Sequence, residues 1–359
     1  MSEMIDWRGD APAEILAPAA AALAEGHIVA LPTESGYELA AAGLNPSAVA
    51  RLCDLTASTE LPAIVLSGAA EAVDWLPWLA TPGTRLIRKL GAGPWKLIAD
   101  GGAAHGLLRH LPPPVQLALC PDRHLALRWP DAGAWTWLAR CLQQPLVSAG
   151  VGAPATAEAL GDLAALVVDM GPCGNGQPTT LMRVTGKAWQ IERPGGLAAG
   201  DAAEALLCHV LFVCTGNTCR SPMAEALMKR LLADRLGCAP DDLRQRGFLV
   251  QSAGLSAIMG APASPDAVVA VQGWGADLAG HRSRPLSLEL LLADHVFAMT
   301  GSHWAALAEL SLSGMPAPQL LSPDGFDVFD PIGSEPEVYR ACASEICEHL
   351  QRRLPEIMG

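Results

Sequence analysis

Short apolar runs alternate with longer, Ala- and Leu-rich stretches along the first half of the chain. The apolar runs predict strands at His27–Leu31, Ala63–Leu66 and Ala165–Val168. The longer stretches predict helices at Ala11–Glu25 and Ala134–Gln143. This alternation is typical of an α/β domain.

The alternation is more regular in the second half. Val210–Val213 predicts a short buried strand, and the helical spacing of apolar residues over Pro222–Leu232 predicts a helix behind a tight loop. Further strands are predicted at Phe248–Ser252, His295–Met299 and Gln319–Leu321, and further helices at Pro265–Trp274, Ser302–Leu310 and Glu335–Leu354. Since strands that alternate with helices form parallel sheets covered on both faces, we expect a second α/β domain.

The aromatic composition changes near residue 205. Eight of the ten Trp residues precede this point, and all five Phe residues follow it. The segment Arg193–Asp201 is rich in Gly, Pro and small residues, as expected of a domain junction. A chain of 359 residues is also long enough for two domains. We therefore expect one domain at residues 1–200 and another at residues 208–359.

The charge and the cysteine content narrow the functional class. The chain carries 24 Lys and Arg against 37 Asp and Glu, a net charge of −13, which disfavours nonspecific binding to nucleic acid. The acidic start, with Glu3, Asp6 and Asp10, is unlike a signal peptide, and no apolar run is long enough to span a bilayer. We therefore expect a cytoplasmic protein without a membrane partner. The ten Cys residues are scattered without regular spacing, which predicts buried thiols and not a disulfide framework.

The loop between the strand at Val210–Val213 and the helix near Pro222 carries a candidate catalytic motif. It holds a nucleophile, Cys214, and a guanidinium, Arg220, at its two ends, followed by Ser221. Backbone N–H groups of such a loop at a helix N-terminus point inward and bind phosphate, and the same field stabilises a thiolate. Gly216 and Asn217 tolerate the left-handed backbone that the wrap requires.

Residues 209–354 resemble the low-molecular-weight protein-tyrosine-phosphatase family. The loop match spans Val213–Glu225, and Ser252–Gly254, His281–Arg284, Asp294–Met299 and Asp330–Pro331 follow. The resemblance implies a four-stranded parallel sheet flanked by helices. It also implies a phosphorylated protein as substrate, and neither cofactor nor metal.

The resemblance assigns roles to individual residues. Cys214 would attack phosphorus and form a phosphocysteine, while Arg220 and the loop amides stabilise the equatorial oxygens. Asp330 would act as the general acid and then the general base, although Asp324 and Asp327 lie nearby and a turn-capping role for Asp330 is the alternative. The other positions of the phosphate-binding loop are Thr215, Gly216, Asn217, Thr218, Cys219 and Ser221, with Ser252 in support.

Two positions of the loop leave alternatives open. Cys219 either forms a reversible disulfide with Cys214, as in similar enzymes, or is a packing residue. Tyrosine phosphatases of this family usually have an apolar residue where this chain has Thr218, and aromatic residues after the Asp-Pro pair, where this chain has Ile332 and Gly333. Thr218 resembles the bacterial protein-arginine-phosphatase branch. The substrate is therefore phosphotyrosine or phosphoarginine.

The first half resembles the YrdC-like family of threonylcarbamoyl-adenylate synthases, which implies a twisted α/β domain. The opening motif is Gly26–Tyr37, and matching stretches follow at Gly91–Trp95, Ala126–Pro130, Pro145–Ser148, Pro178–Leu181 and Ile191–Gly195. Active members bind ATP, threonine and bicarbonate in a basic cavity and serve tRNA modification. The resemblance implies contact with tRNA or double-stranded RNA.

The cavity residues depart from that family. Its Lys-x-Arg pair aligns with Leu55-Thr-Ala57, its Ser-Ala-Asn with Ser148-Ala-Gly150, and a Thr with Lys96. Each lost charge-assisted hydrogen bond removes about 1.5–3 kcal/mol of nucleotide binding, so we expect a retained fold with lost or altered synthase activity. Matching residues that leave nucleotide binding open are Thr33, Arg128, Thr179, Thr180 and Arg193. A bifunctional enzyme and a catalytically silent scaffold are the alternatives to a phosphatase with a ligand-binding or docking module.

Overall fold

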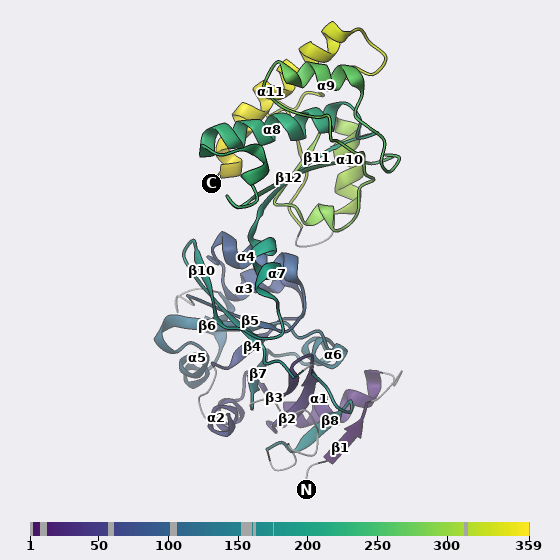
Figure 1. Ribbon diagram of the computed structural model, residues 1–359. Helices are drawn as coiled ribbons and strands as arrows, with labels where there is room; N and C mark the ends of the chain where they lie inside the picture. Colours follow the sequence, from purple (N-terminus) through teal and green to yellow (C-terminus); the bar gives the residue numbers. More distant parts are fainter. Residues whose placement is uncertain are drawn as a thin grey trace. The chain divides into compact units, whose positions relative to one another are not determined.

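The computed structural model describes residues 3–7, 13–56, 61–100, 106–151, 160, 163–174, 176–311 and 315–358. The chain divides into two compact units, Met1–Ala205 and Leu206–Gly359. Figure 1 labels the elements of both units. Each unit has its own hydrophobic core, and the described core clusters contain residues of one unit only.

The N-terminal unit is built around a ten-stranded mixed sheet with the order β1-β8-β2-β3-β7-β4-β6-β5-β9-β10. Its strands are β1 (Glu3–Asp6), β2 (Val29–Thr33), β3 (Gly36–Ala42), β4 (Ala63–Val65), β5 (Trp95–Asp100), β6 (His124–Arg128), β7 (Leu146–Gly150), β8 (Leu166–Asp169), β9 (Thr180–Thr185) and β10 (Ala188–Arg193). Its helices are α1 (Ala17–Ala24), α2 (Pro46–Leu55), α3 (Ala72–Trp75), α4 (Thr81–Leu90), α5 (Pro113–Leu119), α6 (Gly133–Cys141) and α7 (Ala199–Leu206). The last of these, α7, ends at the boundary between the two units.

Three tryptophans of this unit, Trp75, Trp95 and Trp135, are among its largest fully buried side chains. Each indole N–H has a partner, as buried tryptophan requires. Trp135 donates to the carbonyl of Pro32 at 2.8 Å and Trp95 to the carbonyl of Gly91 at 3.0 Å. Part of the Trp content of the first half therefore serves its core.

The C-terminal unit is a four-stranded parallel sheet with the order β12-β11-β13-β14. Its strands are β11 (Cys208–Cys214), β12 (Phe248–Gly254), β13 (His295–Ala298) and β14 (Gln319–Leu320), and its helices are α8 (Arg220–Leu236), α9 (Pro265–Gln272), α10 (Gly301–Leu310) and α11 (Pro336–Met358). Helices α8, α9 and α11 lie together (Figure 1) and contact one another. Helix α10 contacts β13 and β14.

The central strand β11 explains why both faces are covered. Its residues alternate between two core clusters: Val210 and Phe212 pack with residues of α8, α9 and α11, and Leu211 and Val213 pack with Leu307 of α10. A strand buried on both faces needs the continuous apolar run seen in the sequence. Since all four strands are parallel, their carboxyl ends meet at one edge, where the loops that follow them gather.

The predicted elements are present, with shifts at their ends. The predicted helix at Ala11–Glu25 is a 3₁₀ turn, Ala13–Leu16, followed by α1, and residues 11 and 12 lie outside the described part of the chain. The helix predicted at Pro222–Leu232 is longer, since α8 starts at Arg220 and ends before Gly237, which adopts the left-handed conformation of a C-cap. No helix of the described residues is long and apolar enough to cross a membrane.

Candidate active site

The loop between β11 and α8 places Cys214 and Arg220 at the carboxyl edge of the sheet. Cys214 is the last residue of β11 and Arg220 the first of α8, so a strand end and a helix N-terminus hold the loop on both sides. Asn217 inside it has φ 54°, the left-handed region anticipated from the sequence. Leu255 and Ser256, which follow β12, donate their N–H groups to the carbonyls of Cys214 and Thr215, each at 2.9 Å.

The thiol of Cys214 is buried and contacts two groups of its own loop. The Oγ of Ser221 lies 2.9 Å from Sγ, and the backbone N–H of Asn217 donates to Sγ at 3.3 Å. Both groups lie within hydrogen-bond reach of the sulfur.

Asn217 stabilises the loop through both polar groups of its side-chain amide. Its amide group donates to Ser221 Oγ at 3.0 Å and to Ser252 Oγ at 2.8 Å, and its Oδ1 accepts the N–H of Arg284 at 2.9 Å. Ser252 in turn donates to Glu225 at 2.6 Å. Glu225 did not figure among the predicted site residues, although its position four residues after Ser221, one helical turn along α8, indicates that it shares the same face.

Arg220 connects the loop to the predicted general acid. Its guanidinium is buried and donates to Asp330 Oδ2 at 2.5 Å and to the carbonyl of Val328 at 3.2 Å. The carboxylate of Asp330 is 44% exposed, so a substrate can reach it. Two other acidic residues of the same loop are engaged elsewhere: Asp327 accepts the N–H of Gly301 at 2.7 Å, and Asp324 pairs with Arg352. Of the three aspartates, Asp330 is the one that reaches Arg220.

Thr218 and Cys219 lie on the far half of the loop. The carbonyl of half-buried Thr218 accepts the N–H of Ser264 at 2.9 Å. Cys219 is buried, its Sγ lies 3.8 Å from the hydroxyl of Tyr339, and burial raises the pKa of its thiol. Both Cys214 and Cys219 are free thiols in this structure, and Gly216 completes the loop beside Thr218.

A histidine that sequence reasoning missed contacts the loop from α10. His303 Nε2 lies 2.8 Å from Oγ1 of Thr215, and its Nδ1 lies 2.8 Å from Oγ1 of Thr300. Burial lowers the pKa of His303, and the nearby charge of Arg220 lowers it further. No sequence signal links His303 to Thr215, because the two residues are 88 positions apart.

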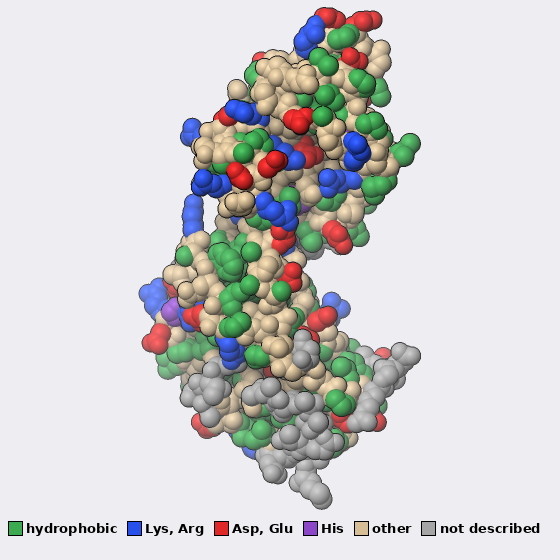
Figure 2. Space-filling model, in the orientation of Figure 1, with side chains coloured by type: hydrophobic (Ala, Val, Ile, Leu, Met, Phe, Trp, Pro, Cys, Tyr) green, Lys and Arg blue, Asp and Glu red, His purple; other side chains and the backbone are tan. Residues whose placement is uncertain are grey.

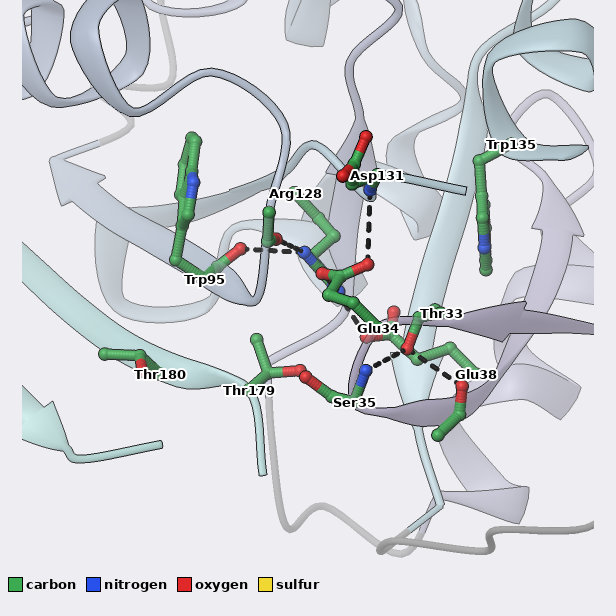
Figure 3. A network of polar contacts seen from close by, with 12 residues as sticks. Thr33, Glu34, Ser35, Glu38, Trp95, Arg128, Asp131, Trp135, Thr179 and Thr180 are labelled. Atoms are coloured by element: carbon green, nitrogen blue, oxygen red, sulfur yellow. Dashed lines mark hydrogen bonds and ion pairs between the residues drawn. The ribbon is translucent and has the colours of Figure 1, made fainter. Parts of the chain in front are cut away.

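The N-terminal unit buries Arg128, which the sequence matched to a nucleotide-binding position (Figure 3). Its Nε donates to Glu38 at 3.1 Å and its Nη2 to Glu34 at 2.6 Å, and its Nη1 donates to the carbonyls of Gly93 and Trp95. Although burial opposes its charge, the two carboxylates raise the pKa of Arg128 above its usual range. Four of the five guanidinium N–H groups are thus used inside the protein.

The other matched residues of this unit are engaged in local contacts. Thr33 Oγ1 donates to the carbonyl of Gly36 at 2.9 Å, and Arg193 donates to the carbonyl of Thr179 at 2.9 Å. Thr180 Oγ1 accepts the N–H of Leu197 at 3.0 Å. Figure 3 shows Thr33, Ser35, Glu34, Glu38 and Arg128 drawn together, with Thr179 beside Ser35.

The residues that align with family cations and polar groups differ in their surroundings. Leu55 ends α2, and Ala57 lies outside the described residues. Lys96 is fully buried and donates to the carbonyl of Leu61 at 3.4 Å, and Ser148 is fully buried on β7. Within the part of the chain that the structure describes, no group of three or more His, Cys, Asp or Glu residues could hold a metal ion.

Two family models match the chain. Residues 209–357 match "Low molecular weight phosphotyrosine protein phosphatase", and residues 21–195 match "Telomere recombination", the Sua5, YciO and YrdC family. The N-terminal unit resembles Sua5 of P. abyssi: the alignment has a TM-score of 0.50 and 16% identity and covers 70% of this chain and 91% of the other, a likeness of fold alone.

Curated relatives align with the C-terminal unit. A protein-arginine-phosphatase of Geobacillus stearothermophilus is 38% identical over 153 residues, which is 41% of this chain and 94% of the relative. The protein-arginine-phosphatase of Bacillus subtilis is 38% identical over 152 residues, 40% and 93% of the two chains. A probable low molecular weight protein-tyrosine-phosphatase of Ralstonia nicotianae is 38% identical over 94 residues, 26% and 56% of the two chains.

Proposed function

Because the chain belongs, through residues 209–357, to the low molecular weight phosphotyrosine protein phosphatase family, we propose that it removes phosphoryl groups from protein side chains through a phosphocysteine at Cys214. The proposal rests on the arrangement of side chains around one loop. The Cys214 thiol contacts Ser221 Oγ and the Asn217 N–H, and the carboxylate of Asp330 forms an ion pair with Arg220.

The first step transfers the phosphoryl group to sulfur. The Cys214 thiolate forms a bond to phosphorus as the bond between phosphorus and the leaving oxygen or nitrogen breaks. Arg220 and the inward N–H groups bind the equatorial oxygens, where negative charge is spread in the transition state. Asp330 gives its proton to the leaving oxygen or nitrogen, so the dephosphorylated side chain does not depart as an anion.

The second step restores the enzyme. A water molecule attacks the phosphocysteine while Asp330, now a carboxylate, accepts its proton. The bond between phosphorus and sulfur breaks, inorganic phosphate leaves, and the hydroxyl of Ser221 stabilises the departing thiolate through its contact at 2.9 Å. The side chain of Ser252 serves the loop through Asn217.

Phosphoarginine is the substrate that we favour over phosphotyrosine. Thr218 provides a hydroxyl where an apolar side chain suits a phenyl ring, and the residues after Asp330-Pro331 are Ile332 and Gly333, neither of them aromatic. The two relatives that align over almost their whole length are named protein-arginine-phosphatases, which supports the same substrate.

The test uses the full-length protein with phosphoarginine and phosphotyrosine peptides. We expect hydrolysis of phosphoarginine that is absent in Cys214→Ser and unaffected by EDTA, since the loop amides and Arg220 supply the charge stabilisation. Thr218→Ile should shift the kcat/KM ratio toward phosphotyrosine. Absence of any Cys214-dependent hydrolysis refutes the phosphatase, and an unchanged ratio in Thr218→Ile refutes the role of Thr218.

For the N-terminal unit we propose a ligand-binding or docking module without synthase activity. Arg128 is already paired with Glu34 and Glu38, so a triphosphate would have to displace two carboxylates. On the face shown in Figure 2, basic side chains of this unit are scattered among acidic and apolar ones. Binding of tRNA or double-stranded RNA, and a cytoplasmic location, stay predictions. Adenylate formation from ATP, threonine and bicarbonate would contradict the loss of synthase activity.

A further inference from the structure

His303 is a buried titratable side chain that the proposed reaction does not use. It lies in the first turn of α10 and is 5% exposed. Each ring nitrogen faces a threonine hydroxyl at 2.8 Å: Nδ1 that of Thr300, which precedes α10, and Nε2 that of Thr215, which follows the nucleophile. The ring therefore bridges the helix N-terminus and the catalytic loop.

We infer the position of the ring proton from the contacts around Thr300. Oγ1 of Thr300 accepts the backbone N–H of His303 at 3.4 Å as the N-cap of α10 and also lies 2.9 Å from the hydroxyl of Ser302, which can donate to it. Its own hydrogen is then free to point to Nδ1. A neutral imidazole that accepts at Nδ1 donates at Nε2, so Thr215 Oγ1 receives the hydrogen bond.

We propose that neutral His303 is a positioning residue of the catalytic loop, which holds Thr215 in place for the attack of Cys214, and that protonation of its ring switches the loop off. The inference rests on the phosphatase function proposed above. It assigns His303 no contact with the substrate.

The position of Thr215 explains why this contact matters. The backbone after the nucleophile is fastened on the β12 side, where the carbonyls of Cys214 and Thr215 accept hydrogen bonds from residues 255 and 256. His303 fastens the same stretch from α10, on the other side of the loop. Thr215 itself is exposed, so packing does not restrain it. Loss of the bond to His303 removes the contact that the Thr215 side chain makes with α10, while the backbone contacts with residues 255 and 256 remain.

The charges that face His303 set the direction of the pH effect. Burial and the positive charge of Arg220 lower the pKa of His303, while the carboxylates of Asp330 and Asp327 raise it by less. The ring is thus neutral at neutral pH and becomes charged only below its usual pKa of 6.5. A charged ring has no acceptor for the hydroxyl of Thr300. It also places a second cation beside Arg220, where it can attract the carboxylate of Asp330. Activity is therefore retained above the folded-state pKa and lost as the pH falls through it.

Two amide variants separate the two ring contacts. The amide of Gln reaches the position of Nε2, so His303→Gln keeps a donor to Thr215 without a titrating group. The amide of Asn reaches only the position of Nδ1, so His303→Asn keeps the contact with Thr300 and loses Thr215. We expect kcat of His303→Asn at pH 7.5 to fall about tenfold with little change of KM, because misplacement of a catalytic group costs turnover, and His303→Gln to recover most of that loss.

The pH dependence of kcat distinguishes the proposed switch from a purely structural role of His303, which would not change that dependence. The ratio of wild-type to His303→Gln kcat should be constant near neutral pH and fall as the pH is lowered through the pKa of His303. His295→Gln, at the amino end of β13 and away from the loop, is the control and should keep the wild-type profile. A constant ratio at all pH values, a wild-type kcat in His303→Asn, or losses in both variants that follow the melting temperature alone would overturn the proposal.

Vanadate binding keeps this test separate from the proposed function. The oxyanion occupies the loop without turnover, so calorimetry of vanadate with the full-length protein reports whether the loop is formed. We expect an affinity about tenfold weaker in His303→Asn and near the wild-type value in His303→Gln. Vanadate binding without Cys214-dependent hydrolysis refutes the phosphatase alone, whereas equal affinities in His303→Asn and wild type refute the positioning role.

Discussion

Arg220 has two tasks that compete for the same guanidinium. In this structure it is paired with Asp330 and with the carbonyl of Val328, and in the proposed reaction it would bind two phosphate oxygens. A phosphate dianion carries more charge than the carboxylate and adds the loop amides as donors, so it displaces Asp330 from Arg220. The displaced carboxyl group is then free to reach the leaving atom. In the proposed mechanism, the ion pair seen here holds the Asp330 carboxylate on Arg220 before the substrate binds and Asp330 takes up a proton.

Replacement of Asp330 tests this assignment. Asp330→Asn removes the proton donor while it keeps a side chain of the same size beside Arg220, and we expect kcat for a phosphoarginine peptide to fall by about 10²–10⁴, the usual contribution of a general acid. Steady-state kinetics with burst analysis measures the effect. Asp324→Asn is the matched control, because Asp324 pairs with Arg352 and should leave kcat unchanged. Equal kcat in Asp330→Asn and wild type would exclude Asp330 as the acid.

At the scale of elements, the loop depends on how closely the end of β12 approaches it. A Cβ on Gly254 would lie 2.5 Å from the carbonyl oxygen of Thr215 and 3.0 Å from the N of Asn217, which are backbone atoms that cannot move independently of the loop. Gly254 ends β12, and its own N–H donates to the carbonyl of Arg284 at 3.0 Å. Only glycine allows the strand and the catalytic loop to pack this closely.

We therefore expect Gly254→Ala to reduce phosphatase kcat at least tenfold and to weaken vanadate binding, because the loop must move away from β12. Its melting temperature should fall by several degrees, in keeping with a cost of about 1–3 kcal/mol for overpacking. Gly273→Ala is the matched substitution, since a Cβ there meets nothing closer than 3.9 Å. Wild-type turnover in Gly254→Ala would show that the loop tolerates a wider spacing.

The sequence predicted those elements and residues whose neighbours are local. The apolar run at Val210–Val213 predicted β11, and the contiguous residues from Cys214 to Ser221 lie together around one site. The helix start was placed two residues late, because Arg220 and Ser221 have polar side chains that belong to the loop motif and also open α8. Backbone hydrogen bonding, which periodicity does not report, decides that boundary.

The unpredicted contacts join residues that are far apart in sequence. His303 meets Thr215 because α10 follows β13, the neighbour of β11 in the sheet. Glu38 meets Arg128 across 90 residues because β3 and β6 belong to one sheet, with β7 and β4 between them. Such pairs depend on strand order and register, and one sequence contains no signal for either. The sequence therefore did not predict the acidic partners of Arg128. Because Glu34 and Glu38 already pair with this cation, its match to a nucleotide-binding position is weaker support for nucleotide binding.

At the scale of the whole molecule, the two units have separate cores, and each can be followed by a different measurement. The described core clusters do not mix residues from the two units. Eight of the ten tryptophans precede residue 205, so tryptophan fluorescence reports mainly on the N-terminal unit, whereas Cys214-dependent turnover reports on the C-terminal one. Unfolding of either unit can therefore be followed in the intact chain.

This separation makes Arg128 testable without touching the phosphatase. Arg128→Met leaves buried Glu38 and partly buried Glu34 without their cation, and removing one partner of a buried pair costs roughly 3–5 kcal/mol. We expect the fluorescence-detected urea midpoint to fall sharply while kcat for phosphoarginine stays at the wild-type value. Arg183→Met, which breaks the more exposed pair with Glu192, should lower the free energy of unfolding by about 1 kcal/mol or less and so shift the midpoint much less. A parallel loss of kcat in Arg128→Met would mean that the N-terminal unit supports the catalytic loop, so the two units would have to be treated as one folding unit.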